Sequence, residues 1–187
     1  KEMRKFPEVI ILLIFCTSSF GIILTIYPAF LNDNGMTATD ILMLYFVFGI
    51  ARVASLALAS KFARKTSQTL IAATIAVSVG LGISVIADSI ITFGIALVLM
   101  GFGFSIFFPL TLEIILSKTR KGISGKIIGA YETVFGMGWA IGPTIGGPIT
   151  QSFGNETPYL VFGVIGIGIT ILAIISRKKL EPQKVVY

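Results

Sequence analysis

The sequence predicts an all-α membrane protein, with six transmembrane helices in one bundle over residues 1–187. Three observations support this prediction. Hydrophobic residues make up 55% of the chain and charged residues 13%, whereas soluble domains carry about 25% charged residues. Six apolar runs are each long enough to cross a hydrocarbon core of about 30 Å as a helix. Basic residues concentrate in alternate connections between these runs, as in multi-pass membrane proteins.

The first three predicted helices cover residues 9–31, 40–60 and 68–87. The first run is too long for the apolar region of a signal peptide, so we expect a mature membrane helix. The second run carries Arg52 near its middle, and the third run has no charged residue.

The last three predicted helices cover residues 90–116, 127–150 and 159–176. The fourth contains Pro109, the fifth is rich in glycine and proline, and the sixth has no charge. Charge-free helices suit a lipid-facing position, so we expect the third and sixth on the outside of the bundle. Membrane bundles of six helices can be built as three plus three helices in inverted topology, which we expect here from architecture alone.

The distribution of basic residues predicts the orientation of the chain in the membrane. All but one of the 15 lysines and arginines lie on one side, and Arg52 is the exception. The opposite side carries acidic residues only: Asp33, Asp40, Asp88 and Glu156. The positive-inside rule makes the basic side cytoplasmic, with both termini inside a multi-pass protein of the cell membrane.

Composition also argues against several classes of function. The chain has no histidine, and its one cysteine, Cys16, lies inside an apolar run. We therefore expect no metal site, no cofactor and no enzymatic activity, since no nucleophile has a base to activate it. The net charge of +6 comes from short clusters between apolar runs, so we expect a lipid bilayer and not nucleic acid as the partner.

Three ionisable residues lie within the apolar runs: Arg52, Glu113 and Glu132. Each costs roughly 2.5–3.5 kcal/mol at a helix centre, so such residues usually face a cavity or a partner. Arg52 lies about 13 Å along the helix from Lys61 and could bind substrate, act as a gate or pair with a carboxylate for packing. Glu132 could pair with Arg52, carry a coupling proton or serve as a structural carboxylate near the cytoplasmic mouth.

Two further groups are candidates for the path of a substrate or for its gate. Tyr27, Phe104 and Tyr131 could line a substrate path, although single aromatic residues are more often packing residues. Glu113, near the cytoplasmic end of its helix, favours a structural role as an inner latch.

Glycines in the fifth apolar run predict a close helix contact. Gly138, Gly142 and Gly146 occupy every fourth position and therefore share one helix face, which allows a neighbouring helix to approach closely. Pro143 lacks a backbone N–H and should bend the helix. Such a face suits an interface that slides or rocks, and equally a static close-packed interface.

These residues resemble a known family, the major facilitator superfamily (MFS) of transporters. The segment from Gly138 to Gly147 resembles the family pattern G-x-x-x-G-P-x-x-G-G. Residues 58–65, LASKFARK, resemble the loop motif L-A-D-R-x-G-R-K, with Ser60 in place of the acid. Glu113 and Arg120 match the E-x6-R spacing of some sugar-type members. The last match would pair Glu113 with Arg64 or Arg120 in the inner latch.

The resemblance implies one half of an MFS transporter. The degenerate loop motif, the basic tail after the sixth helix and the absence of an initiator methionine favour the C-terminal half. The family then implies alternating access, with a small-molecule substrate bound between this half and an N-terminal six-helix half. Coupling to protons is an open possibility for such a half. The alternative is a self-sufficient six-helix protein that acts as a homodimeric carrier or a channel.

Overall fold

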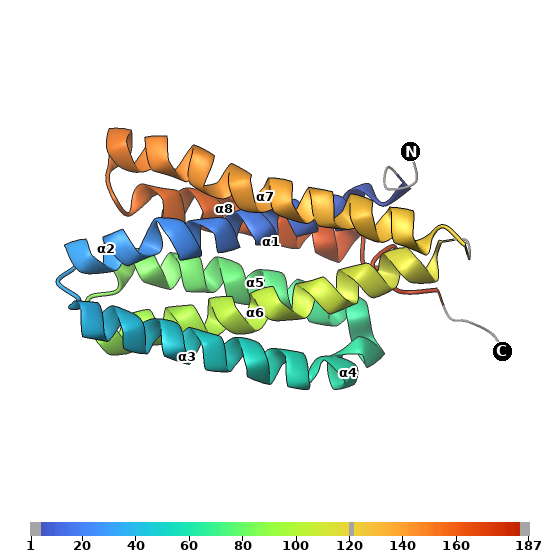
Figure 1. The fold of residues 1–187 in the computed structure, drawn as a ribbon, viewed down its shortest axis with the longest axis horizontal. Helices are drawn as coiled ribbons and strands as arrows, with labels where there is room; N and C mark the ends of the chain where they lie inside the picture. The colour runs from blue at the N-terminus through green and yellow to red at the C-terminus, as the bar shows by residue number, and fades with distance from the viewer. Residues whose placement is uncertain (1–4, 120–121, 184–187) are drawn as a thin grey trace.

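The computed structural model describes residues 5–119 and 122–183, and these residues form an all-helical bundle (Figure 1). The six apolar runs lie on long helices, and the first two runs continue into short ones. The long helices are α1 (Pro7–Thr25), α3 (Ala38–Ala57), α5 (Thr66–Ile86), α6 (Ile90–Ser117), α7 (Ser124–Phe153) and α8 (Thr157–Ile175). The short ones are α2 (Tyr27–Asp33), α4 (Ala59–Phe62) and the 3-10 helix η2 (Ala63–Lys65).

The first apolar run bends at Ile26, between α1 and α2. Pro28 has no N–H to donate to the carbonyl of Leu24, and its ring crowds that carbonyl. The N–H of Ile26 still bonds to Ile22, at 2.9 Å, and its carbonyl accepts from Phe30, at 3.2 Å. The run therefore bends and continues, whereas the sequence predicted one uninterrupted helix.

Side-chain caps fix where two of the membrane helices begin. The Thr37 hydroxyl accepts from the N–H of Asp40, and the Asp40 carboxylate accepts from the N–H of Thr37 at 2.9 Å, so α3 begins at Ala38. Ser89 and Thr92 form the same reciprocal box at the start of α6. Such boxes satisfy N–H groups that the first helical turn leaves without a partner.

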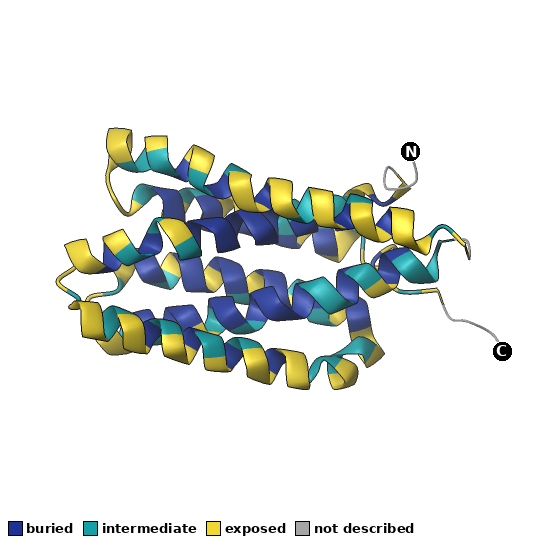
Figure 2. Cartoon of the chain, in the orientation of Figure 1, coloured by how far each residue is buried: buried dark blue, intermediate teal, exposed yellow. Residues whose placement is uncertain are grey.

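The helices pack so that α3 and α7 form opposite edges of the bundle, with α1, α5 and α6 between them (Figure 1). α3 packs on α6, α6 on α5 and α5 on α8, while α1 lies mainly against α7. Within this chain, 44% of the residues in the apolar window of the α5 segment are buried, compared with 22% in that of α3. The outer faces of α3 and α7 are exposed (Figure 2), and the lipid-facing position expected for the third and sixth apolar runs stays a prediction.

Among the described residues, five helical segments are long and apolar enough to cross a membrane. They are α1, α3, the segment Ala59–Ile86, α6 and α8. The 30-residue α7 is about 45 Å long, which is enough to span, but its many glycines and prolines lower its hydropathy. The described residues are thus all helical, with five segments suited to crossing a membrane, and a crossing by α7 stays a prediction.

The segment after α8 folds back over the basic end of the bundle. Leu180 is completely buried there. The Lys179 ammonium pairs with Glu8 at the start of α1, and the Glu181 carboxylate accepts from the hydroxyl and N–H of Ser67 on α5. These contacts join the last described residues to the first turns of two membrane helices.

Candidate functional site

Close approach of α3 and α6 places Arg52 inside the bundle. A Cβ on Gly101 would lie 2.9 Å from the Phe48 carbonyl oxygen, so only glycine lets the two helices come this close. About two turns further along α3, the Ser55 hydroxyl donates to the carbonyl of Phe102 at 2.7 Å. The side chain of Arg52, between these two contacts in sequence, therefore reaches α6 directly.

The guanidinium of Arg52 lies among three phenylalanine rings. Its Nε donates to Ser105 Oγ at 3.3 Å, and its Cζ lies 4.8 Å from the centre of the Phe20 ring. The rings of Phe104 and Phe48 lie 5.5 and 5.6 Å away. We call these five residues the Arg52 cluster. A cation over an aromatic face gains from about 0.5 to 2 kcal/mol, which partly offsets the cost of burying the charge.

Within the described ranges, Arg52 makes no ion pair with a carboxylate. Glu132, which the sequence offered as its partner, is exposed on α7 and is not joined to it by any ion pair. The guanidinium carries five N–H donors, and the hydrogen bond to Ser105 uses only the one on Nε. The remaining donors can therefore bind an acceptor from outside this chain.

Aromatic contacts extend the Arg52 cluster to α7. Phe20 and Phe104 stack at 3.7 Å between ring centres, and Trp139 on α7 lies 5.8 Å from Phe20. Phe135, one turn before Trp139, lies 6.3 Å from Phe104. Because Trp139 is 42% exposed, the cluster continues to the surface between the two edges of the bundle. The sequence candidates Arg52 and Phe104 thus come together.

The two candidate tyrosines lie elsewhere and are completely buried. Tyr131 shares a 2.8 Å hydrogen bond with Thr111 on α6. Tyr27, at the bend between α1 and α2, shares a 2.7 Å hydrogen bond with Ser84 on α5. In this conformation both hydroxyls join helices and neither ring faces an open path.

The glycine face of α7 packs directly on α1. A Cβ on Gly142 would stand 2.0 Å from the carbonyl oxygen of Ser18, and one on Gly138 would stand 1.8 Å from Thr17 Oγ1. The hydroxyl of Ser18 donates to the Gly138 carbonyl at 2.9 Å. Gly146 continues the same face, and Pro143 follows Gly142 within α7. The spacing read from the sequence therefore marks a real helix contact.

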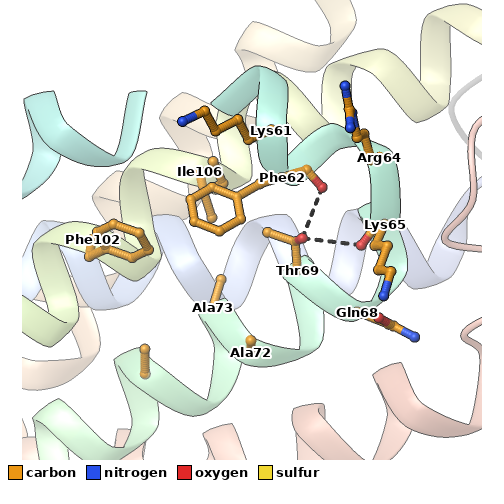
Figure 3. A pocket seen from close by; sticks show the side chains of 11 residues that line it. Lys61, Phe62, Arg64, Lys65, Gln68, Thr69, Ala72, Ala73, Phe102 and Ile106 are labelled. Atoms are coloured by element: carbon orange, nitrogen blue, oxygen red, sulfur yellow. Dashed lines mark hydrogen bonds between the residues drawn. The ribbon is translucent and has the colours of Figure 1, made fainter. Parts of the chain in front are cut away.

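The latch residues are not joined in this structure. Glu113 is exposed near the basic end of α6, and no ion pair connects it to Arg64 among the described residues. Arg64 instead lies at the rim of a pocket beside η2 (Figure 3). Arg120, the other expected partner, lies outside the described residues.

Sequence reasoning did not identify Phe20, Phe48 or Ser105 as partners of Arg52. Phe20 and Phe48 stand in apolar helices among many similar residues, so no local pattern distinguishes them. A weak signal exists for Ser105, because Pro109 removes the helical hydrogen bond to its carbonyl and makes the helix irregular there.

Comparison with known proteins identifies the family. The model of the Major Facilitator Superfamily matches residues 9–186. The chain belongs to this superfamily. The match runs from the third residue of α1 to beyond α8, so the fold of this MFS chain and its multi-pass character are those of a membrane transporter family.

Three relatives of the MFS chain are transporters by name. A multi-drug resistance efflux pump PmrA homolog of Lactococcus lactis is 26% identical over 175 residues, which is 90% of this chain and 43% of that protein. The human MFS-type transporter SLC18B1 is 39% identical over 51 residues, 27% of this chain and 11% of that protein. An uncharacterised MFS-type transporter of Methanocaldococcus jannaschii is 37% identical over 67 residues, 36% of this chain and 16% of that protein. The chain thus spans less than half the length of these relatives.

Proposed function

We propose that this MFS chain is the C-terminal half of a secondary transporter that moves a small organic solute across the cell membrane by alternating access. An N-terminal six-helix half, or a second copy of the chain, completes the substrate site. The observation that carries the proposal is the Arg52 cluster, in which a cation with no carboxylate partner among the described residues lies beside three aromatic rings. A charged side chain within a membrane helix is expensive, and such residues are typically functional.

The proposed topology has six crossings, with α7 as the fifth and both termini in the cytoplasm. The basic loops support this orientation. The packing pattern supports a three-plus-three inverted repeat, since α3 packs on α6 much as α7 packs on α1. In that arrangement α3 and α7 hold equivalent edges, and the surface between them receives the other half.

The chemistry of the cluster supports an organic substrate with an aromatic or anionic group. Phe20, Phe104 and Trp139 offer stacking surfaces, and the guanidinium offers donors to a carboxylate or phosphate. The name of the PmrA homolog supports the export of organic compounds. Glu132 is the proposed proton carrier, since it is an exposed carboxylate within the α7 segment.

Transport of dyes by the natural full-length protein tests the proposal. Efflux of anionic carboxyfluorescein and of cationic ethidium would be followed from cells that express Arg52→Ala, Arg52→Lys or the control Val53→Ala. Val53 neighbours Arg52 but is 68% exposed. We expect Arg52→Ala to abolish efflux of every dye that the wild type moves, with unchanged membrane insertion, and Val53→Ala to leave efflux normal. Arg52→Lys should recover little, because an ammonium cannot reproduce the planar guanidinium. Normal efflux by Arg52→Ala would disprove the role of the cluster.

A further inference from the structure

A pocket of about 470 Å³ lies at the basic end of the bundle, away from the Arg52 cluster. It opens where α4 and η2 turn into α5, beside α6 (Figure 3). The side chains that line it are basic or polar at the rim and apolar below: Lys61, Arg64, Lys65, Gln68 and Thr69 above Phe62, Ala72, Ala73, Ala76, Phe102 and Ile106.

Among the described residues that line this pocket, the rim holds three cations and no carboxylate. Lys61, Arg64 and Lys65 make no ion pair among the described residues. The hydroxyl of Thr69 bonds to the carbonyls of Phe62 and Lys65, at 3.0 and 3.1 Å, and so holds the basic turn against α5 (Figure 3). These bonds hold the turn in place, and the charged ends of Lys61, Arg64 and Lys65 point outward from it in different directions (Figure 3).

Below the rim, the pocket continues as an apolar groove between α5 and α6. Ala72 and Ala76 supply small side chains one turn apart, and Phe102 and Ile106 form the other wall. Phe62 packs edge-on against Phe102 with ring centres 5.7 Å apart. Lys65 and Ala76 are separated by about 16 Å along a helix, close to the ~15 Å depth of one leaflet of hydrocarbon.

We propose that this pocket binds one anionic phospholipid of the cytoplasmic leaflet, with its phosphate at the basic rim and an acyl chain in the groove. Charge complementarity selects an anionic headgroup, since arginine and lysine are the side chains that bind phosphate. Basic pockets between membrane helices on the cytoplasmic side bind such headgroups. The apolar groove requires an attached chain and so distinguishes a lipid from free phosphate. The inference rests on the proposed orientation, in which this end faces the cytoplasm.

Lipid titration with native mass spectrometry tests the site on the natural full-length protein in detergent. Dioleoyl phosphatidylglycerol and dioleoyl phosphatidylcholine are the probes. The test variant replaces the three rim cations by glutamine, and a control variant makes an equal charge change at exposed cations of the same side: Lys126, Arg177 and Lys178. We expect the test variant to bind phosphatidylglycerol about 100-fold more weakly, at roughly a factor of five per cation. The control variant should bind it as the wild type does.

A second variant examines the groove without altering charge. Ala72→Phe should weaken phosphatidylglycerol binding about tenfold by displacing roughly two methylene groups of the lipid, whereas Ile75→Phe on the same helix should not.

Equal binding of phosphatidylglycerol by the rim variant and its charge control would overturn the proposal. So would full displacement of the lipid by millimolar glycerol phosphate, which would make this a site for soluble phosphates. Because lipid retention is measured without transport, failure here would leave the role of Arg52 standing.

Discussion

The contact between α7 and α1 allows a sharp test at Gly142. A methyl group there would stand 2.0 Å from the carbonyl oxygen of Ser18, whereas ordinary contact begins at 3.4 Å. The backbone of α1 cannot turn aside as a flexible side chain would. In Gly142→Ala the two helices must therefore separate by more than 1 Å along their whole contact.

The cost of that separation can be worked from the contacts it breaks. Overpacking of this kind costs about 1–3 kcal/mol, and a gap of 0.5–1 Å forfeits a quarter to a half of each dispersion contact. The hydrogen bond from Ser18 to the Gly138 carbonyl, at 2.9 Å, would lengthen with the gap and lose about 0.6 kcal/mol. The total is roughly 2–4 kcal/mol of unfolding free energy.

Gly136→Ala is the matched control, because nothing lies within 4 Å of a Cβ at that position of the same helix. Both variants gain about 1 kcal/mol of helix propensity, so the difference between them isolates the steric term. The free energy of unfolding would be measured by titrating the detergent-purified protein with dodecyl sulfate. Equal stability of the two variants would refute the close contact of α7 with α1.

Two further predictions concern the exposed acid of α7 and the C-terminal segment. Glu132→Gln should preserve solute movement down its own gradient but abolish accumulation driven by a pH gradient in proteoliposomes; accumulation at the wild-type level would exclude Glu132 as the proton carrier. Leu180→Ala removes a completely buried side chain at a cost of about 2–3 kcal/mol, so trypsin should cleave beside Arg177 at least about tenfold faster. The 77% exposed Ile175→Ala is its control, and equal cleavage of the two variants would show that Leu180 does not hold the segment in place.

The length and hydropathy of the apolar runs were sufficient to predict the helical class, because a membrane helix satisfies its backbone hydrogen bonds within one continuous segment. The glycine spacing of α7 was equally informative, since residues four apart share a face whatever the neighbouring helix is. The bend at Pro28 was readable in principle from its missing N–H, although the apolar run by itself predicted one helix.

What the sequence determined by itself was therefore local: which segments are helical, which face of α7 is small and which end is basic. Tertiary structure alone decided which residues meet. Phe20, Phe48 and Phe104 come from three helices, and only the close packing at Gly101 brings their rings around Arg52. The same holds for the pocket beside η2, whose apolar walls come mainly from α5 and α6. Contacts between helices depend on three-dimensional shape complementarity, which no single helix encodes.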